Sequence, residues 1–276
     1  MNFCYQVATP DVKIDESVTA YQGPLEDSFE NLSKLGYDGV ELMTLNPKEL
    51  DWKEVKGLLK KHNLIAALVC TGEIFGQLKL SYTDPDEMVR KEAIRRTKEI
   101  IDFAGYLDAD INIGRIRGQY NASLPKEKTW NFAKEAFKEI SVYAKGKNVK
   151  IALETVTIMQ TNFINTLEEG LQMVKDVNED NFKLMMDVFH LNIEEKDIYE
   201  AIRRYQPFNI HVHLADNNRR YPGHCGLDFE KIIKTFKECG YEGNFSTEIF
   251  QIPNQEVAAQ EAIRHLKPIF DKVYQK

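Results

Sequence analysis

Short apolar segments rich in β-branched residues alternate with amphipathic helical patterns eight times along this chain. The segments expected to form strands span residues 1–8, 38–43, 64–70, 109–114, 149–154, 182–187, 209–214 and 244–249. Strands that alternate with helices form parallel sheets, and strands this apolar are buried on both faces. Eight such units in a chain of 276 residues predict an α/β fold, a single closed (β/α)8 barrel spanning residues 1–276.

The helices expected between these strands fit the same architecture, which is that of a TIM barrel. They span residues 24–36, 51–62, 85–107, 126–145, 166–177, 195–205, 228–240 and 256–274. The main alternative is an open, doubly wound sheet, which usually carries a glycine-rich phosphate loop after its first strand. The chain has VATPDVKID at that position instead, so the pattern favours the closed barrel.

Composition and charge argue against several classes of function. The formal net charge is −7, and an acidic chain lacks the basic surface that phosphodiester backbones need, so no nucleic-acid partner is expected. No segment reaches the roughly 18 apolar residues of a membrane span, so no membrane partner is expected either. The start MNFCYQVATPD lacks the pattern of a signal peptide. The spacing of the four cysteines fits neither a metal site nor a disulfide framework, which indicates reduced thiols in a cytoplasmic protein.

Ionisable residues end several of the predicted strands. They are Glu41, Glu154, Asp187, His213 and Glu248. A barrel places its active site at the carboxyl ends of its strands, and carboxylates gathered there repel one another unless a cation lies among them. The last four residues come from four consecutive strands and offer three carboxylates and one imidazole. This set suits one divalent ion, Mn²⁺, Mg²⁺ or Co²⁺ for its oxygens and Zn²⁺ for its nitrogen. The alternative is that each acid caps a helix or pairs with a lysine.

The seventh predicted strand runs into an unusually polar segment, HVHLADNNRRYPG. His211 and His213 are two residues apart and therefore point to the same side of the strand. His213 is nearer the rim and is the expected ligand, whereas His211 is expected to make a supporting hydrogen bond one layer lower. Arg219 could act on a bound substrate from the loop, and Arg220 is expected to be a solvated loop charge.

Four motifs occur in order along the chain: ALE, MDVFH, HVHLADNNRRYPG and STEI. With GYDGVEL in the second strand, they make the chain resemble the sugar isomerases and epimerases with a xylose-isomerase-like barrel, and most closely the ketose 3-epimerases of the D-tagatose/D-psicose type. The resemblance implies a metal-dependent isomerase that acts on a sugar. It implies one divalent ion, with Mn²⁺ preferred, held by the ligand set Glu154, Asp187, His213 and Glu248.

The resemblance also assigns roles in catalysis. It implies that Glu154 and Glu248 transfer protons at the carbon next to the ketone, through an enediolate, and that His190 and Arg219 bind the substrate oxygens. Two departures concern the substrate. Gln160 stands where the family has a second glutamate, and PGHCGLDF places Cys225 where a glycine is usual. Gln160 and Glu41 are further candidates for substrate binding, and a homodimer or homotetramer is the expected assembly.

Two arginines after the fourth strand indicate a different substrate. In INIGRIRGQYN, Arg115 and Arg117 are expected on the same side of an extended segment, where they could bind a phosphate or carboxylate group. The alternative is that they pair with carboxylates on helices. If they bind an anion, the substrate is a ketose phosphate or a sugar acid rather than a free sugar.

Other functions on the same barrel stay open. An aldose–ketose isomerase of the hydroxypyruvate type would move the proton between C1 and C2 with the same carboxylates. An inosose-type dehydratase would use the enolate to expel water. A sugar-binding barrel without activity is a further alternative. An apurinic-site endonuclease is disfavoured, because its three-metal cluster needs more histidines than these strand ends supply.

Overall fold

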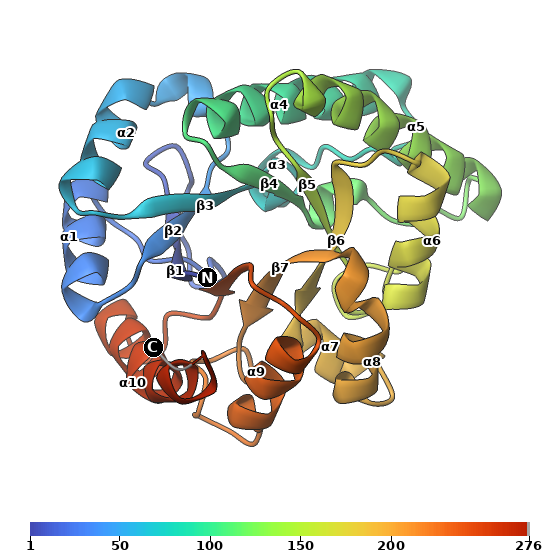
Figure 1. The fold of residues 1–276 in the computed structure, drawn as a ribbon. Helices are drawn as coiled ribbons and strands as arrows, with labels where there is room; N and C mark the ends of the chain where they lie inside the picture. Colours follow the sequence, from blue (N-terminus) through green and yellow to red (C-terminus); the bar gives the residue numbers. More distant parts are fainter. Residues whose placement is uncertain (275–276) are drawn as a thin grey trace.

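Eight parallel strands form a closed barrel in the computed structural model, which describes residues 1–274. Each strand pairs with the next one along the chain, and the eighth pairs with the first. Figure 1 shows the strands at the centre, with the final helix returning beside the first helix to complete the outer ring. The strands are β1 Phe3–Ala8, β2 Gly39–Met43, β3 Ile65–Cys70, β4 Asp110–Ile113, β5 Ile151–Glu154, β6 Phe182–Asp187, β7 Asn209–Leu214 and β8 Asn244–Thr247. The predicted barrel is confirmed.

Ten α-helices in the described chain surround the strands. They are α1 Leu25–Leu35, α2 Trp52–Lys61, α3 Gly72–Leu78, α4 Glu87–Tyr106, α5 Lys126–Lys145, α6 Leu167–Val177, α7 Val188–Glu194, α8 Ile198–Tyr205, α9 Phe229–Glu238 and α10 Gln255–Tyr274. The 3₁₀ turns are η1 Pro47–Glu49, η2 Arg115–Arg117 and η3 Gln206–Phe208. The sequence did not predict α3 and α7, because helices of seven residues are too short to show a helical period. Both directly follow a strand, so they lie at the rim where an active site is expected.

The segment that carries Arg115 and Arg117 differs from its prediction. It is a 3₁₀ turn rather than an extended strand continuation. Gly118, in the left-handed region at φ 91°, ends this turn and redirects the chain. The two arginines therefore leave the turn toward different neighbours, and the prediction that they lie on one side of an extended segment is wrong.

Strand alternation separates the barrel interior from the layer beneath the helices. In β7, Val212 and Leu214 belong to the hydrophobic core, while the side chains of His211 and His213 contact each other on the opposite side. Burying each large aliphatic side chain of that core contributes roughly 1.5–3 kcal/mol. The apolar layer thus orients the strands so that their polar residues point into the barrel.

Backbone register brings residues of neighbouring strands to one level. Asp187 at the end of β6 pairs with His213, and His213 pairs with Ser246 in β8. Because parallel strands in register carry paired residues at the same height, Asp187, His213 and Ser246 lie in one layer of the barrel. Glu248 follows Ser246 by two residues, so its side chain is expected on the same side of the strand, nearer the rim.

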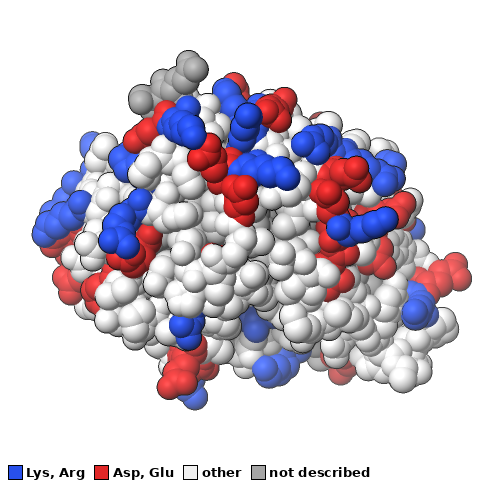
Figure 2. All heavy atoms as spheres, turned by 90° about the horizontal axis from the view of Figure 1, so that it is seen from below, with Lys and Arg blue, Asp and Glu red and all other residues white. Residues whose placement is uncertain are grey.

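The surface carries mixed charge. On the face drawn in Figure 2, lysine and arginine side chains lie next to aspartate and glutamate side chains. Surface pairs of this kind contribute at most about 1 kcal/mol each, so the apolar core accounts for most of the stability. Among the helices of residues 1–274, none combines the length and the apolar character needed to cross a bilayer.

The start of α6 allows a direct test of helix capping. The hydroxyl oxygen of Thr166 accepts a hydrogen bond from the Glu169 N–H at 3.2 Å, and the Glu169 carboxylate accepts one from the Thr166 N–H at 3.2 Å. Thr166→Ala should lower the free energy of unfolding by about 1 kcal/mol, because the backbone N–H of Glu169 loses its acceptor. Thr166→Ser keeps the oxygen and serves as the control. Urea denaturation followed by circular dichroism measures both, and equal losses in the two variants would contradict the capping role.

Candidate active site

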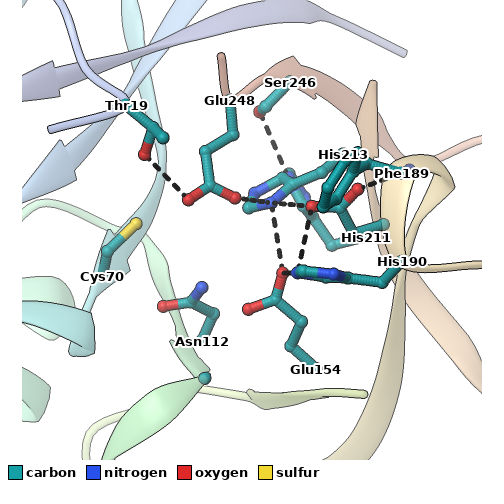
Figure 3. Close-up of polar contacts among 12 residues, drawn as sticks. Thr19, Cys70, Asn112, Glu154, Phe189, His190, His211, His213, Ser246 and Glu248 are labelled. Carbon is teal, nitrogen blue, oxygen red and sulfur yellow. Dashed lines mark hydrogen bonds and ion pairs between the residues drawn. The ribbon is translucent and has the colours of Figure 1, made fainter. Parts of the chain in front are cut away.

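Four ligand-type side chains converge at the carboxyl end of the barrel. Glu154 ends β5, Asp187 ends β6, His213 lies in β7, and Glu248 directly follows β8. One atom from each lies within 4.8 Å of the corresponding atom of every other. His213 Nδ1 lies 2.8 Å from Glu248 Oε2, 3.6 Å from Glu154 Oε1 and 3.8 Å from Asp187 Oδ2. The four residues that the sequence predicted as one ligand set are therefore brought together, and Figure 3 shows three of them, Glu154, His213 and Glu248.

Unsatisfied polar atoms show what this cluster fits. Glu154 Oε1, His213 Nδ1 and Glu248 Oε2 are buried and make no well-aligned hydrogen bond to the described residues. Leaving a buried polar atom unpaired costs about 1–3 kcal/mol, and more for a charged group. Three such atoms aimed at one point, two of them carboxylate oxygens, have the chemistry of a site for a divalent cation. The residues present thus fit one metal ion.

Glu41 orients the imidazole of this cluster. The Nε2–H of His213 donates to Glu41 Oε2 at 2.9 Å, which leaves Nδ1, the nitrogen that would bind an ion, facing the three carboxylates. The other oxygen of Glu41 forms an ion pair with His211, whose Nε2 also lies 3.2 Å from Ser246 Oγ. A carboxylate behind a metal-binding histidine holds the ring in its tautomer and raises its basicity.

The positions of Glu41 and His211 bear on two predictions. Glu41 is 0% exposed, and burial alone would raise its pKa, but His213 and His211 hold that pKa far below the ordinary value. Glu41 does not line the cavity above the cluster, which corrects its assignment to substrate binding: the carboxylate lies beneath the cluster. His211 makes supporting contacts one layer lower, as predicted.

Arg219 balances the negative charge of the cluster. Its Nη1 lies 3.0 Å from Asp187 Oδ2 and its Nη2 lies 2.7 Å from Glu248 Oε2. Burial would raise the pKa of both carboxyls, but this guanidinium, with nearby histidines, holds both pKa values far below the ordinary range. The pKa of Glu154 is instead raised, chiefly by burial. The two candidate proton-transfer groups therefore have different electrostatic surroundings.

One aspartate organises the loop that carries Arg219. The carboxylate of Asp216 accepts hydrogen bonds from the backbone N–H groups of Asn217, Gly223, Cys225 and Leu227 at 2.8–3.3 Å. Arg219 itself has the left-handed φ of 57°, a conformation that its surroundings must hold in place. These contacts account for the polar residues after β7: Asp216 holds the loop backbone, and Arg219 is part of the site. Sequence reasoning did not identify the role of Asp216.

His190 is placed as a neutral hydrogen-bond donor. Burial lowers its pKa to about 4, so the ring is uncharged at neutral pH. Its Nδ1 accepts from the Thr157 N–H at 3.3 Å, and the hydrogen therefore lies on Nε2. That Nε2 is 3.8 Å from both Glu154 Oε1 and Asp187 Oδ2, so it can donate to a substrate oxygen beside the cluster.

A second network, which sequence reasoning missed, supports Glu248 from the other side. Thr19 Oγ1 lies 3.0 Å from Glu248 Oε1 and 3.0 Å from the side-chain oxygen of Gln6. The amide of Gln6 donates to Cys70 Sγ at 3.3 Å. These residues come from β1, the loop after it and the end of β3, so no local motif could have revealed their association.

A cavity of about 320 Å³ opens above the cluster. Of the predicted site residues, those that line it are Glu154, Glu248, His190, Arg219, Gln160 and Arg115. Asp187 and His213 are completely buried beneath it. The volume accommodates a small polar molecule next to the two glutamates.

Arg117 is separated from this cavity. It is 0% exposed, and its guanidinium donates to the carbonyl oxygens of Phe163 at 2.9 Å, of Ile164 at 3.0 Å and of Glu154. Burial lowers its pKa to about 10. The prediction that Arg117 binds an anionic substrate is therefore wrong, because backbone carbonyls already occupy its donors.

The hydrogen bond between His213 and Glu41 allows a test of the proposed metal site. Glu41→Gln should weaken Mn²⁺ binding by about 10–100-fold, because the imidazole loses the carboxylate that orients it. His213→Ala should lose most of the affinity, and His211→Ala, the matched histidine control, should still bind one ion. Titration calorimetry measures all three, with circular dichroism to confirm folding. Stoichiometric binding by His213→Ala with wild-type affinity would refute the ligand set.

The chain matches the model of the family described as "Xylose isomerase-like TIM barrel" over residues 29–269. It is 30% identical to the D-psicose 3-epimerase of Ruminiclostridium cellulolyticum over 230 residues, which cover 80% of this chain and 77% of the relative. It is 27% identical to the L-ribulose 3-epimerase of Mesorhizobium japonicum over 256 residues, covering 90% and 83%. A solved structure of an L-ribulose 3-epimerase superposes with a TM-score of 0.83 at 21% identity, covering 98% of this chain and 95% of the other. The chain belongs to the family of xylose isomerase-like TIM barrels.

Proposed function

We propose that this protein is a metal-dependent ketose 3-epimerase. The observation that carries the proposal is the convergence of Glu154 and Glu248, which line one cavity and also share one cation site. Relatives named D-psicose and L-ribulose 3-epimerase support a sugar isomerase. A small-molecule sugar is the proposed substrate.

The bound ion would supply positive charge for a ketone oxygen and its neighbouring hydroxyl, which makes the adjacent C–H more acidic. Glu154, Asp187, His213 and Glu248 would hold it. Three oxygen donors and one nitrogen suit Mn²⁺ best, and Mg²⁺, Co²⁺ and Zn²⁺ are the other candidates.

The two glutamates would carry the proton transfers. One carboxylate removes the C3 proton from the substrate, and the other returns a proton on the opposite face, so that the configuration of that carbon inverts. A positioned carboxylate base contributes roughly 10²–10⁴-fold to the rate. The hydrogen bond from Thr19 to Glu248 Oε1 limits rotation of that carboxylate while its other oxygen faces the cluster.

His190 and Arg219 would stabilise the enediolate that forms between the two transfers. The Nε2–H of His190 and the guanidinium of Arg219 are fixed donors at the cavity wall. Donors that are already oriented stabilise developing negative charge most effectively, because they need little reorganisation. Gln160, which also lines the cavity, would offer an amide to a substrate hydroxyl.

A panel of ketoses incubated with the Mn²⁺-loaded protein in D₂O tests this function. NMR identifies the carbon that acquires deuterium. Exchange at C3 with formation of the epimer is the expected result. Exchange between C1 and C2 would indicate an aldose–ketose isomerase, loss of water an inosose-type dehydratase, and turnover of phosphorylated ketoses alone a ketose-phosphate 3-epimerase.

The cytoplasmic location and the homodimer or homotetramer stay predictions.

The Glu→Gln variants separate proton transfer from metal binding. Glu154→Gln and Glu248→Gln each keep one oxygen toward the ion but remove the base, so each should abolish epimerisation. One variant should still exchange the C3 proton of a single epimer with D₂O, and the other variant only that of the opposite epimer. Metal content is measured in parallel. Near-wild-type epimerisation by either metal-loaded variant would refute the two-base mechanism.

A further inference from the structure

The cavity has two chemically distinct sides. The four ligand-type residues come from the β5–β8 half of the barrel, whereas Asn112, Glu73 and Arg115 line the cavity from the β3–β4 side. Figure 3 shows Cys70 and Asn112 across the open space from His190 and His213. The proposed proton transfers use none of these three polar residues. A ketose bound at its carbonyl end by the first side would extend its far end toward them.

Glu73 is a carboxylate buried at this far side. Its side chain is 8% exposed and lies in the first turn of α3. Its Oε1 accepts from Arg115 Nη2 at 2.7 Å and its Oε2 accepts from Gln77 at 2.9 Å. A carboxylate has about four acceptor positions, so each oxygen keeps capacity for a hydroxyl donor.

The chain makes room for the partner of this carboxylate. Gly72 and Gly76 lie in α3 beneath the Arg115 guanidinium. A Cβ atom on Gly76 would come within 2.9 Å of Arg115 Nη2, so the end of the Arg115 side chain would have to shift. Arg115 therefore lies along α3 and pairs with Glu73, which largely neutralises its charge at the cavity. This outcome matches the expected alternative for Arg115, a pairing with a helix carboxylate.

Asn112 offers an unused donor on the same side. It is 5% exposed and its Oδ1 accepts from the Thr71 N–H at 3.3 Å, which orients the amide. Its Nδ2 has no hydrogen-bond partner within residues 1–274, yet the residue lines the cavity. This amide N–H₂ can therefore donate to an oxygen atom of a ligand in the cavity.

We propose that Asn112, Glu73 and Arg115 form a subsite for the far-end hydroxyl groups of an uncharged ketose, and that Glu73 excludes ketose phosphates. The proposal rests on the proposed function and adds its substrate class. A sugar hydroxyl group can donate to Glu73, and a sugar oxygen can accept from Asn112, since both residues line the cavity. A phosphate dianion has no hydrogen to donate, and it would meet a carboxylate that already occupies the guanidinium of Arg115. Repulsion and lost hydrogen bonds therefore act together against the phosphate.

Binding measurements on the Mn²⁺-loaded protein test this subsite, because one variant is expected to gain affinity for a sugar phosphate. Calorimetry with D-psicose and D-psicose 6-phosphate gives the affinity ratio of the two ligands. Glu73→Gln should shift that ratio toward the phosphate by at least about tenfold, because Arg115 becomes free to bind it. The double variant Glu73→Gln/Arg115→Gln should lose this gain. Glu87→Gln on the outside of α4 removes the same charge and should leave the ratio unchanged.

A deoxy sugar tests the hydrogen bonds separately. Wild type should bind D-psicose at least about tenfold more tightly than 6-deoxy-D-psicose, and Asn112→Leu should erase most of this difference. An unchanged phosphate ratio in Glu73→Gln, or binding of neither sugar by the wild type, would overturn the subsite. Absence of C3 exchange with every ketose would instead refute the proposed epimerase, whether or not the binding ratios shift as expected.

Discussion

The hydrogen bond from His213 to Glu41 decides how the rest of the site is arranged. It directs one nitrogen of the imidazole downward to a buried carboxylate and the other upward to three more. Without that direction, the cluster at the barrel rim would contain repelling carboxylates with no common centre. The ion pair between Glu41 and His211 anchors the carboxylate in turn. A column of polar side chains in contact with one another therefore runs through the barrel interior and ends at the cation site.

The same need for compensation explains the loop above the barrel. Three carboxylates converge, and Arg219 contacts two of them. A long, flexible side chain loses conformational freedom when it is held so closely. The Asp216 carboxylate reduces that loss by fixing the loop backbone through several N–H groups. Most of this loop is exposed, and its two buried charged side chains, Asp216 and Arg219, each have defined partners.

The two halves of the barrel supply different groups to the cavity. The β5–β8 half supplies the cation ligands and the donors around the proposed reacting carbon. The other half supplies Gln6, Asn112 and the short helix α3, whose polar groups border the remaining wall. The pairing of β8 with β1 closes the barrel. Residues that are far apart in the chain therefore face each other across one small cavity.

Much of this architecture could be predicted from residue patterns alone. Strand and helix periods determine the barrel, because burial on both faces leaves little choice for eight short apolar strands. The positions of Glu154, Asp187, His213 and Glu248 at successive strand ends also determine their convergence, since parallel strands bring like ends together.

The tertiary structure decided what no local pattern encodes. Arg115 and Arg117 are two residues apart and chemically alike, yet one pairs with Glu73 on α3 and the other is enclosed by backbone carbonyls. Glu41 resembles the other strand-end acids in sequence but lies one layer lower. In each case the outcome depends on which distant groups fill the space around the side chain. Hydrogen-bond partners and burial are set by packing between segments, whereas periodicity describes only how a segment presents its faces.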